Sequence, residues 1–312
     1  MTGPPRTTGA QPASRVAIVT TSWPRYDDDA AGHFVRTEAL QLERAGHELV
    51  VLAAPSGGCG DAFGWPGVAT RLRERPTRAI GAAYWVMSTR TRLARLEVAR
   101  VVAHWAVPSA WPIGVVTRGS IEVVSHGGDV RLLAASPRAL RRHVVLAIAS
   151  RADRWRFVSQ PLLLDLLRTL DRDVCSRVEQ IATVQPAAIE MPDVSNAISQ
   201  RRRSFGGARV AVSVARLIKS KRVDRAIDHL AESGEFDVLV IVGDGPERSR
   251  LERLAHSRRV DARFIGMVSR RDSLAWIGAA DALLHASSAE GSSTVLREAE
   301  ALGTAIRRLD CR

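Results

Sequence analysis

The sequence predicts an α/β protein with two doubly wound parallel sheets, and three observations predict it. The chain has 312 residues, enough for two domains that each bury a core of their own. Its beginning reads strand, loop, helix, glycine and strand, with strands expected at Arg15–Ser22 and Glu48–Ala54 around a helix at His33–Ala45. The same alternation restarts at Ala208 and runs to Gly303. Apolar runs without polar alternation are typical of strands buried on both faces of a parallel sheet.

The bulk composition sets the outline of the domains. Residues 1–14 are rich in Pro, Thr and Gly without an apolar core, so we expect a disordered tail and not a signal peptide. We expect an N-terminal domain at 15–192, a linker at 193–207 and a C-terminal domain at 208–312. The cysteines, Cys59, Cys175 and Cys311, have no metal-binding spacing. A cytoplasmic protein is the default, with peripheral contact at the inner face of the membrane as an addition.

The first domain continues with apolar strands, each followed by a loop or helix. We expect the strands at 101–104, 121–125, 153–159 and 181–185, and helices over most of 71–100 and 160–170. The strand at 121–125 ends in His126-Gly127-Gly128-Asp129. A histidine beside two glycines at the carboxyl end of a strand is typical of a cleft, because glycine allows a ligand to approach the backbone. The alternative is a turn histidine bonded to local backbone.

The net charge of +12 comes almost entirely from arginine, since the chain has 45 basic residues and only two are lysines, Lys219 and Lys221. The basic blocks at 71–100 and 131–156 favour an anionic partner. An amphipathic segment in the first block would suit an anionic membrane surface, although a solvated helix face is the more ordinary interpretation. The arginines lack interleaved aromatic residues and no nucleic-acid motif is present, so we expect no nucleic-acid partner.

In the second domain, strands are expected at 208–215, 236–242, 263–266 and 282–285. Arg216 and Lys221 lie where the first of these strands gives way to a helix, a place at which two cations would stabilise a phosphate. The Gly243-Asp244-Gly245-Pro246 turn is interpreted as architectural.

The stretch Asp281–Gly303 organises the chain. A strand leads to a polar turn with Glu290, and a helix follows that carries Glu298 and stops at Gly303. Ser292, Ser293 and Thr294 are candidate N-caps, and the N–H groups at this helix start would suit a phosphate.

These motifs together resemble the retaining glycosyltransferases of family 4, which have the GT-B fold. The resemblance rests on Glu290 and Glu298 as the E-x7-E signature, on Arg216 and Lys221, on the G-D-G-P turn and on the His126 loop. It implies two Rossmann-like domains that face each other across a cleft. It also implies a retaining, metal-independent hexosyltransferase without cofactor. Such an enzyme would move a sugar from a nucleotide-diphosphate donor to a glycan or lipid-linked acceptor, for example in cell-envelope polysaccharide synthesis.

The resemblance assigns roles residue by residue. Glu298 would bind the ribose, Glu290 the sugar, and Arg216, Lys221 and the N–H groups at Ser292, Ser293 and Thr294 the diphosphate. Met267 and Val268 would lie near the base. His126 would face the transferred sugar and, with Glu290, would be catalytic. Gly32, Gly127 and Asp129 would lie on the acceptor side.

The chain departs from the family in several places. Arg222 stands where relatives usually have glycine, and Ala31-Gly32 replaces a pair of glycines. Family members also continue well past Gly303, whereas this chain stops nine residues later. We therefore expect an incomplete second domain, as after a truncation or frameshift, a polar and abrupt end, and weak or absent activity of the isolated chain. A nonenzymatic nucleotide-sugar-binding or helper protein, and a sugar-nucleotide epimerase, remain alternatives.

Overall fold

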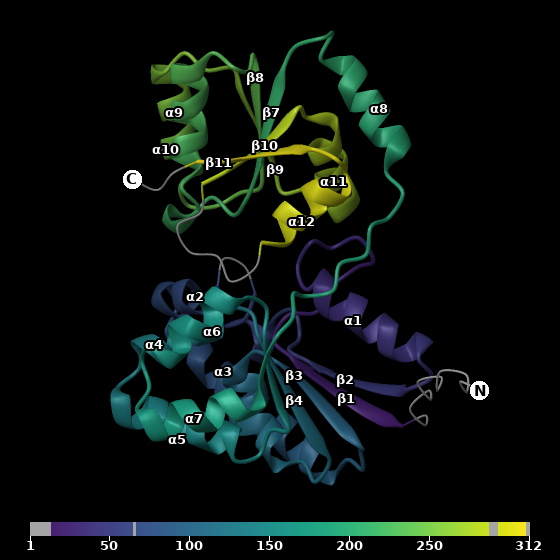
Figure 1. The fold of residues 1–312 in the computed structure, drawn as a ribbon, viewed down its shortest axis with the longest axis vertical. Helices are drawn as coiled ribbons and strands as arrows, with labels where there is room; N and C mark the ends of the chain where they lie inside the picture. The colour runs from purple at the N-terminus through teal and green to yellow at the C-terminus, as the bar shows by residue number, and fades with distance from the viewer. Residues whose placement is uncertain (1–13, 65–66, 287–292, 310–312) are drawn as a thin grey trace, which may run out of the picture. The chain divides into compact units, whose positions relative to one another are not determined.

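A computed structural model describes residues 14–64, 67–286 and 293–309 of the chain. The chain divides into two compact units, each with a parallel sheet of its own (Figure 1). Among the described residues, unit 1 contains 14–23, 35–64 and 71–188, and unit 2 contains 24–34, 67–70 and 189–309. The predicted α/β class with two doubly wound sheets is confirmed.

The sheet of unit 1 has six parallel strands in the order β2-β1-β3-β4-β5-β6. Strand β1 is apolar and buried from its second residue onward, as expected for a strand covered on both faces. The order reverses between β1 and β3, because the chain crosses from β2 over β1 to reach β3. The strands are β1 (Arg15–Thr20), β2 (Glu48–Ala53), β3 (Arg100–His104), β4 (Ser120–Ser125), β5 (Arg154–Phe157) and β6 (Ala182–Val184).

The helices that accompany this sheet are α1 (His33–Arg44), α2 (Val68–Glu74), α3 (Arg78–Arg95), α4 (Gly128–Ala135), α5 (Arg138–Ala149), α6 (Gln160–Leu167) and α7 (Arg172–Ile181). The helix expected over most of 71–100 is divided into α2 and α3, because Pro76 lacks an N–H and restricts the residue before it. After β3 the chain forms irregular helical turns at Ala106–Ile113. Val107 and Trp111 have extended backbone there, as residues before proline prefer.

The sheet of unit 2 has five parallel strands in the order β11-β10-β7-β8-β9. They are β7 (Val210–Val214), β8 (Val238–Val242), β9 (Ala262–Gly266), β10 (Ala282–His285) and β11 (Ala305–Arg308). Four were predicted, and β11 was not, because its residues read as a polar end. It is an edge strand: Ile306 packs against the core while Arg307 and Arg308 are exposed. The residues that we expected as a polar and abrupt end thus include a strand of the sheet.

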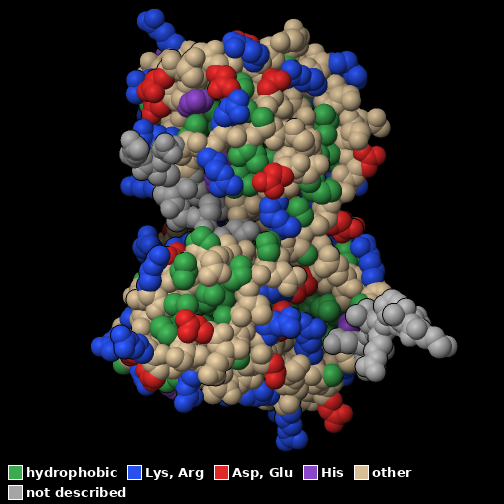
Figure 2. Space-filling model, viewed as in Figure 1, with side chains coloured by type: hydrophobic (Ala, Val, Ile, Leu, Met, Phe, Trp, Pro, Cys, Tyr) green, Lys and Arg blue, Asp and Glu red, His purple; other side chains and the backbone are tan. Residues whose placement is uncertain are grey.

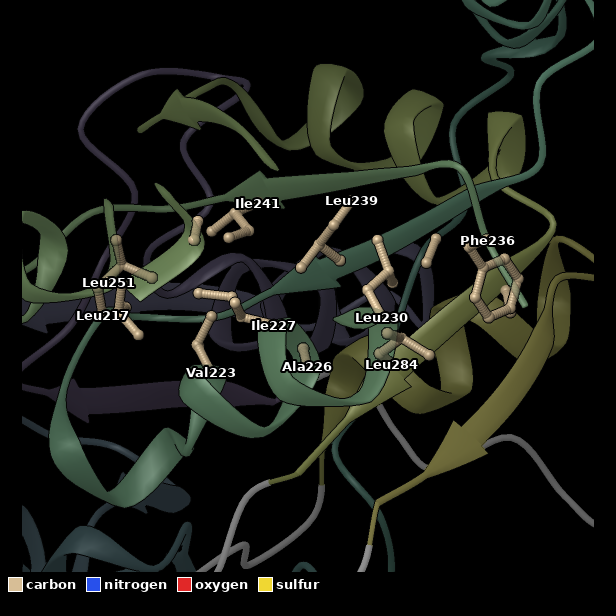
Figure 3. Packing of buried hydrophobic residues seen from close by; sticks show 13 residues of the cluster. Leu217, Val223, Ala226, Ile227, Leu230, Phe236, Leu239, Ile241, Leu251 and Leu284 are labelled. Carbon is tan, nitrogen blue, oxygen red and sulfur yellow. The ribbon is translucent and has the colours of Figure 1, made fainter. Parts of the chain in front are cut away.

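Alternation along these strands divides the core of unit 2 between two faces. One face carries Leu239, Ile241 and Leu284 and is covered by α9 (Val223–Ser233) and α10 (Arg248–Ser257), as Figure 3 shows. The other carries Val240, Val242 and Leu283 and is covered by α11 (Arg270–Ala279) and α12 (Thr294–Ala301). Each fully buried Leu or Ile side chain contributes roughly 1.5–3 kcal/mol through the hydrophobic effect. Because the strands are parallel, the loops that follow them all lie at the same edge of the sheet.

The segment expected as a linker contains a helix, α8 (Ser195–Ser204), that packs against α11. Ile198 lies so close to Gly278 of α11 that a Cβ on that glycine would be 2.4 Å from Ile198 Cδ1. Arg202 of α8 also forms a bidentate ion pair with Asp281, with both N–O distances 2.8 Å. The arginines and glycines that suggested a linker therefore belong to a helix packed within unit 2 and to its C-terminal turn.

Candidate functional site

The switch point of the unit 2 sheet lies between β7 and β10, the strands at which the chain order reverses. Ligands of open α/β sheets bind at the carboxyl ends of the strands at such a point. The turn with Arg216 and Lys221 follows β7, and α12 with Glu298 follows β10. Because β7 and β10 are neighbouring parallel strands, both segments begin at the same edge of the sheet.

Backbone hydrogen bonds tie the turn after β7 to the turn after β8. Leu217 N donates to Asp244 O at 2.9 Å, and Glu247 N donates to Leu217 O at 3.0 Å. Leu217 itself is fully buried, which anchors the turn to the core. Gly243 N donates to Gly266 O at 2.9 Å, so the end of β9 joins the same network. These bonds support the interpretation of the G-D-G-P turn as architectural.

The two cations of this turn that we expect at the phosphates, Arg216 and Lys221, differ in exposure. Arg216 is exposed and Lys221 is half-buried, at the end of a short 3-10 turn over Lys219–Lys221. Arg222 follows in a left-handed conformation, with φ 48° and ψ 39°. A non-glycine residue adopts it at a cost of roughly 1–2 kcal/mol. This conformation explains why glycine would suit the position.

Glu298 is buried in unit 2, with 5% of its surface exposed, and has a specific cationic partner. Arg270 Nη2 donates to Glu298 Oε1 at 3.1 Å and to Glu190 O at 2.5 Å. His33 Nε2 lies 4.0 Å from the same carboxylate oxygen. Burial raises the pKa of Glu298, and the Arg270 charge opposes that rise. Burial, assisted by Arg270, lowers the pKa of His33 to about 3.

Arg270 is a residue that sequence reasoning missed. It begins α11 directly after the loop with Met267 and Val268, but one arginine among so many carries no signal of its own. Met267 is 59% exposed, whereas Val268 packs against the core of unit 2. The two residues expected near a base therefore have different surroundings.

The start of α12 is only partly described. Ser293 occupies the N-cap position without a side-chain capping bond, and Thr294 is the first helical residue. Glu290 and Ser292, two of the predicted site residues, lie outside the described residues. The catalytic role expected for Glu290 therefore stays a prediction.

The loop before α1 contributes to unit 2, although we expected Gly32 to belong to the first domain. Asp28 caps α11 in two ways: its backbone oxygen accepts from Arg270 N, and its carboxylate accepts from Arg271 N, both at 2.8 Å. A carboxylate at a helix N-terminus is electrostatically favourable. Gly32 is buried in this segment and has a φ of 73°, which glycine adopts without strain.

In unit 1, the His126 loop is held by one carboxylate. Asp129 Oδ1 accepts from His126 N at 3.2 Å and from Gly127 N at 3.0 Å, while Oδ2 accepts from Ala106 N at 2.8 Å. Asp129 is 2% exposed, so three backbone N–H groups replace its hydration. Gly127 has a φ of 115°, which requires glycine. Asp129 therefore holds the backbone of this loop, and the supporting role expected for it on the acceptor side stays a prediction.

His126 lies beside a second histidine, at the end of the neighbouring strand. His104, the last residue of β3, is fully buried, and its Nδ1 is 3.0 Å from His126 Nε2. The two rings are nearly parallel, with an interplanar angle of 17°. Burial, with the Arg156 charge, lowers the pKa of His104 to about 3. Burial and the charges of His104 and Arg156 lower the pKa of His126 well below 6.5.

The outer face of α3 is a separate feature. Ile80, Tyr84 and Met87 are 75%, 68% and 58% exposed, and their spacing puts them on one side of the helix. A groove of about 530 Å³ lies beside them and is lined by Tyr84, Met87, Ser88, Thr91, Arg92, Arg95 and Leu96. None of the predicted site residues that the structure describes lines this groove. In the face that Figure 2 shows, Lys and Arg side chains are spread over the surface among Asp and Glu.

None of the helices described is both long and apolar enough to span a bilayer. In the same part of the chain, no group of three or more His, Cys, Asp or Glu side chains could hold a metal ion.

Comparisons with known proteins give a family match for part of the chain and a common fold for most of it. Residues 194–306 match the family model "Glycosyl transferases group 1". No curated protein has a sequence that matches the chain. Among solved structures, the chain is similar to HepE from Anabaena in complex with UDP and glucose, with TM-score 0.65 and 16% identity over 94% of this chain and 80% of that one.

Two further structures have the same architecture. One is sucrose-phosphate synthase from Thermosynechococcus elongatus, with TM-score 0.67 and 18% identity over 94% of this chain and 80% of that one. The other is the UDP-forming α,α-trehalose-phosphate synthase from Burkholderia vietnamiensis, with TM-score 0.64 and 14% identity over 93% and 82%. At these identities the likeness shows the fold alone. The fold is GT-B, with two Rossmann-like domains, as predicted.

Proposed function

We propose that the chain is a glycosyltransferase that moves a sugar from a nucleotide-diphosphate sugar to an acceptor. One observation carries the proposal: the match to the group 1 glycosyltransferase model covers residues 194–306, which include Arg216, Lys221 and Glu298. HepE, a structural neighbour, was solved with UDP and with UDP-glucose. We therefore take UDP as the first nucleotide to test.

In this proposal Glu298 accepts hydrogen bonds from the ribose hydroxyls. Its burial favours strong hydrogen bonds, because water does not compete for the carboxylate. Arg270, 3.1 Å from Oε1, favours the ionised form, which is the form that accepts two hydroxyl donors. Met267 and Val268, at the end of β9, would adjoin the base.

The diphosphate would be held by Arg216, Lys221 and the N–H groups at Ser293 and Thr294. Negative charge grows on the leaving diphosphate as the glycosidic bond breaks, and fixed cations stabilise that charge. Arg216 and Lys221 follow β7, whereas Ser293 and Thr294 follow β10, its neighbour in the sheet. These positions at one edge of the sheet support the proposed role. We expect transfer to be independent of added metal and to retain the anomeric configuration, with His126 and the predicted Glu290 at the sugar. An EDTA titration and the NMR coupling of the product's anomeric proton test these two expectations.

An acceptor carried on a lipid is supported by the outer face of α3. Three large apolar side chains are exposed there, and Arg92 and Arg95 line the adjoining groove. Apolar side chains flanked by arginine suit the boundary of an anionic membrane. We propose that this face contacts such a surface.

Isothermal titration with UDP, GDP, ADP and UDP-glucose tests the donor site. A ligand at a hundredfold excess over its Kd should stabilise the fold by about 2.7 kcal/mol. Glu298→Gln should weaken binding by roughly tenfold or more, since hydrogen bonds to a charged group contribute about 1.5–3 kcal/mol. Glu300→Gln, an exposed position on the same helix, is the matched control. Lys221→Ala should also weaken binding, with Lys219→Ala as its control.

The outcomes separate the alternatives. Equal binding by Glu298→Gln and Glu300→Gln contradicts the ribose role. Donor binding without transfer to any acceptor favours the nonenzymatic binding protein. Conversion of UDP-glucose to another UDP-sugar without an acceptor favours the epimerase.

A further inference from the structure

Unit 1 contains a pair of neighbouring histidines, one fully buried and one half-buried, of which the proposed reaction uses only His126. His104 ends β3 and His126 follows β4, and the two strands are paired neighbours in the sheet. His104 is fully buried, and its Nδ1 lies 3.0 Å from His126 Nε2. Trp105 covers the His126 ring, with centroids 4.9 Å apart. We call His104 and His126 the histidine pair.

A carboxylate lies beyond the buried member of this pair. Glu38 of α1 has Oε2 at 3.9 Å from His104 Nε2, the ring nitrogen on the side away from His126. His104 Nε2 is buried and has no hydrogen-bond partner within hydrogen-bonding distance among the described atoms. Glu38 Oε2 is therefore the charged atom that the structure places opposite that nitrogen.

The remaining charges around the pair are balanced. Arg156 Nη2 donates to Glu38 Oε1, and Arg156 Nε lies 3.0 Å from Glu122 Oε1. Arg100 pairs with the other oxygen of Glu122. Two guanidinium groups thus neutralise two carboxylates, and the histidine pair stays uncharged: burial and the Arg156 charge lower the pKa of both imidazoles.

A hydrogen bond between two neutral imidazoles needs one N–H and one lone pair, so the tautomers of the pair are coupled. A lone pair on His104 Nε2 would face the negative charge of Glu38, whereas an N–H there would be attracted to it. The proton of His104 therefore belongs on Nε2, and its Nδ1 accepts. His126 Nε2 must then donate, which leaves His126 Nδ1 without a proton.

We infer that Glu38 and His104 are positioning residues that hold His126 in the Nε2–H tautomer. With that tautomer fixed, His126 Nδ1 is a hydrogen-bond acceptor, which suits a sugar hydroxyl as donor. The use of this acceptor in glycosyl transfer rests on the proposed function, whereas the tautomer itself does not. A carboxylate that sets the tautomer of a histidine through its far nitrogen is a general device of enzyme sites.

NMR of the full chain with 15N-labelled histidine tests the inference directly. Long-range 1H–15N correlations distinguish Nε2–H, Nδ1–H and charged imidazole, and His126→Gln identifies the signals of that ring. We expect the Nε2–H pattern for both members of the pair at pH 7.5. An Nδ1–H pattern for His126 in the unmodified protein overturns the inference, whatever the enzyme assay shows.

Two variants test the positioning residues. His104→Phe keeps an aromatic ring but removes the acceptor, and Glu38→Gln removes the charge; each should give His126 a mixture of tautomers. Each should also lower kcat/KM by at least about tenfold, with little change in donor affinity. Glu43→Gln, at an exposed position of α1, should change neither the tautomer pattern of His126 nor kcat/KM. An unchanged His126 pattern in a folded His104→Phe protein also overturns the inference. Absence of transfer in the unmodified chain, with the expected tautomers, counts against the proposed function alone.

Discussion

Replacement of His104 should reduce the sensitivity of the fold to acid. The imidazole is fully buried, and burial together with Arg156 lowers its pKa from 6.5 to about 3. Between these two values the unfolded chain binds a proton that the folded protein does not. The free energy of unfolding therefore rises with pH in this window, and the contribution of His104 is lost as the pH falls from 6.5 toward 3.

The size of the destabilisation follows from the difference between the pH of the measurement and the pKa of His104 in the unfolded chain. Each pH unit inside the window changes the free energy of unfolding by about 1.4 kcal/mol. At pH 5.0, about 1.5 units below the unfolded value, His104 alone should cost roughly 2 kcal/mol relative to pH 7.5. His33, whose pKa is also lowered to about 3, adds a similar cost. The raised pKa of Glu298 acts in the opposite direction, but it is present in parent and variant alike.

Urea unfolding at pH 7.5 and pH 5.0, followed by circular dichroism, measures the effect. We expect the parent to lose about 2 kcal/mol more than His104→Gln between the two pH values. The comparison uses the change with pH, so the direct cost of the substitution cancels. His256→Gln, on the exposed face of α10, is the control and should behave as the parent does. Equal losses in the parent and in His104→Gln would refute the reasoning.

Two further predictions concern the turn after β8 and the outer face of α3. Gly243→Ala should destabilise the fold by about 2 kcal/mol or more, because the new Cβ would lie 2.0 Å from Ala215 O at a φ of 125°. Urea unfolding measures it, and Gly234→Ala, with open space around its Cβ, should cost roughly 1 kcal/mol. The double variant Ile80→Ser, Tyr84→Ser should sediment less with phosphatidylglycerol vesicles than the parent does. Equal sedimentation with these vesicles would contradict the proposed lipid contact.

The fold of unit 2 was predictable because its signals are local. The apolar runs of β8 and β10 and the glycines at the ends of helices indicate strands and helices without distant partners, and β10 begins and ends where the sequence predicts. Strand β11 and helix α8 were missed for a common reason. Their apolar side chains are few, and Ile306 and Ile198 become informative only when the surface that each covers is known.

The candidate site was less predictable because it depends on pairs from distant parts of the sequence. The loop position of His126 and the helix position of Glu298 follow from patterns near each residue. Their partners do not: His104 and Arg270 become visible only when neighbouring strands and helices are assembled. Nothing local distinguishes Arg270 from the other arginines, and His104 has the same apolar setting as an ordinary core residue.

Asp129 limits how the two turns that it joins can vary in sequence. One carboxylate serves N–H groups from the turn after β3 and from the turn after β4. Asparagine offers one oxygen, and every neutral replacement leaves at least one of these donors without an acceptor. Other side chains in the two turns can vary, but the backbone of each turn has to keep its position relative to the other. A graft of either turn onto another scaffold would have to carry the aspartate and the opposing turn with it.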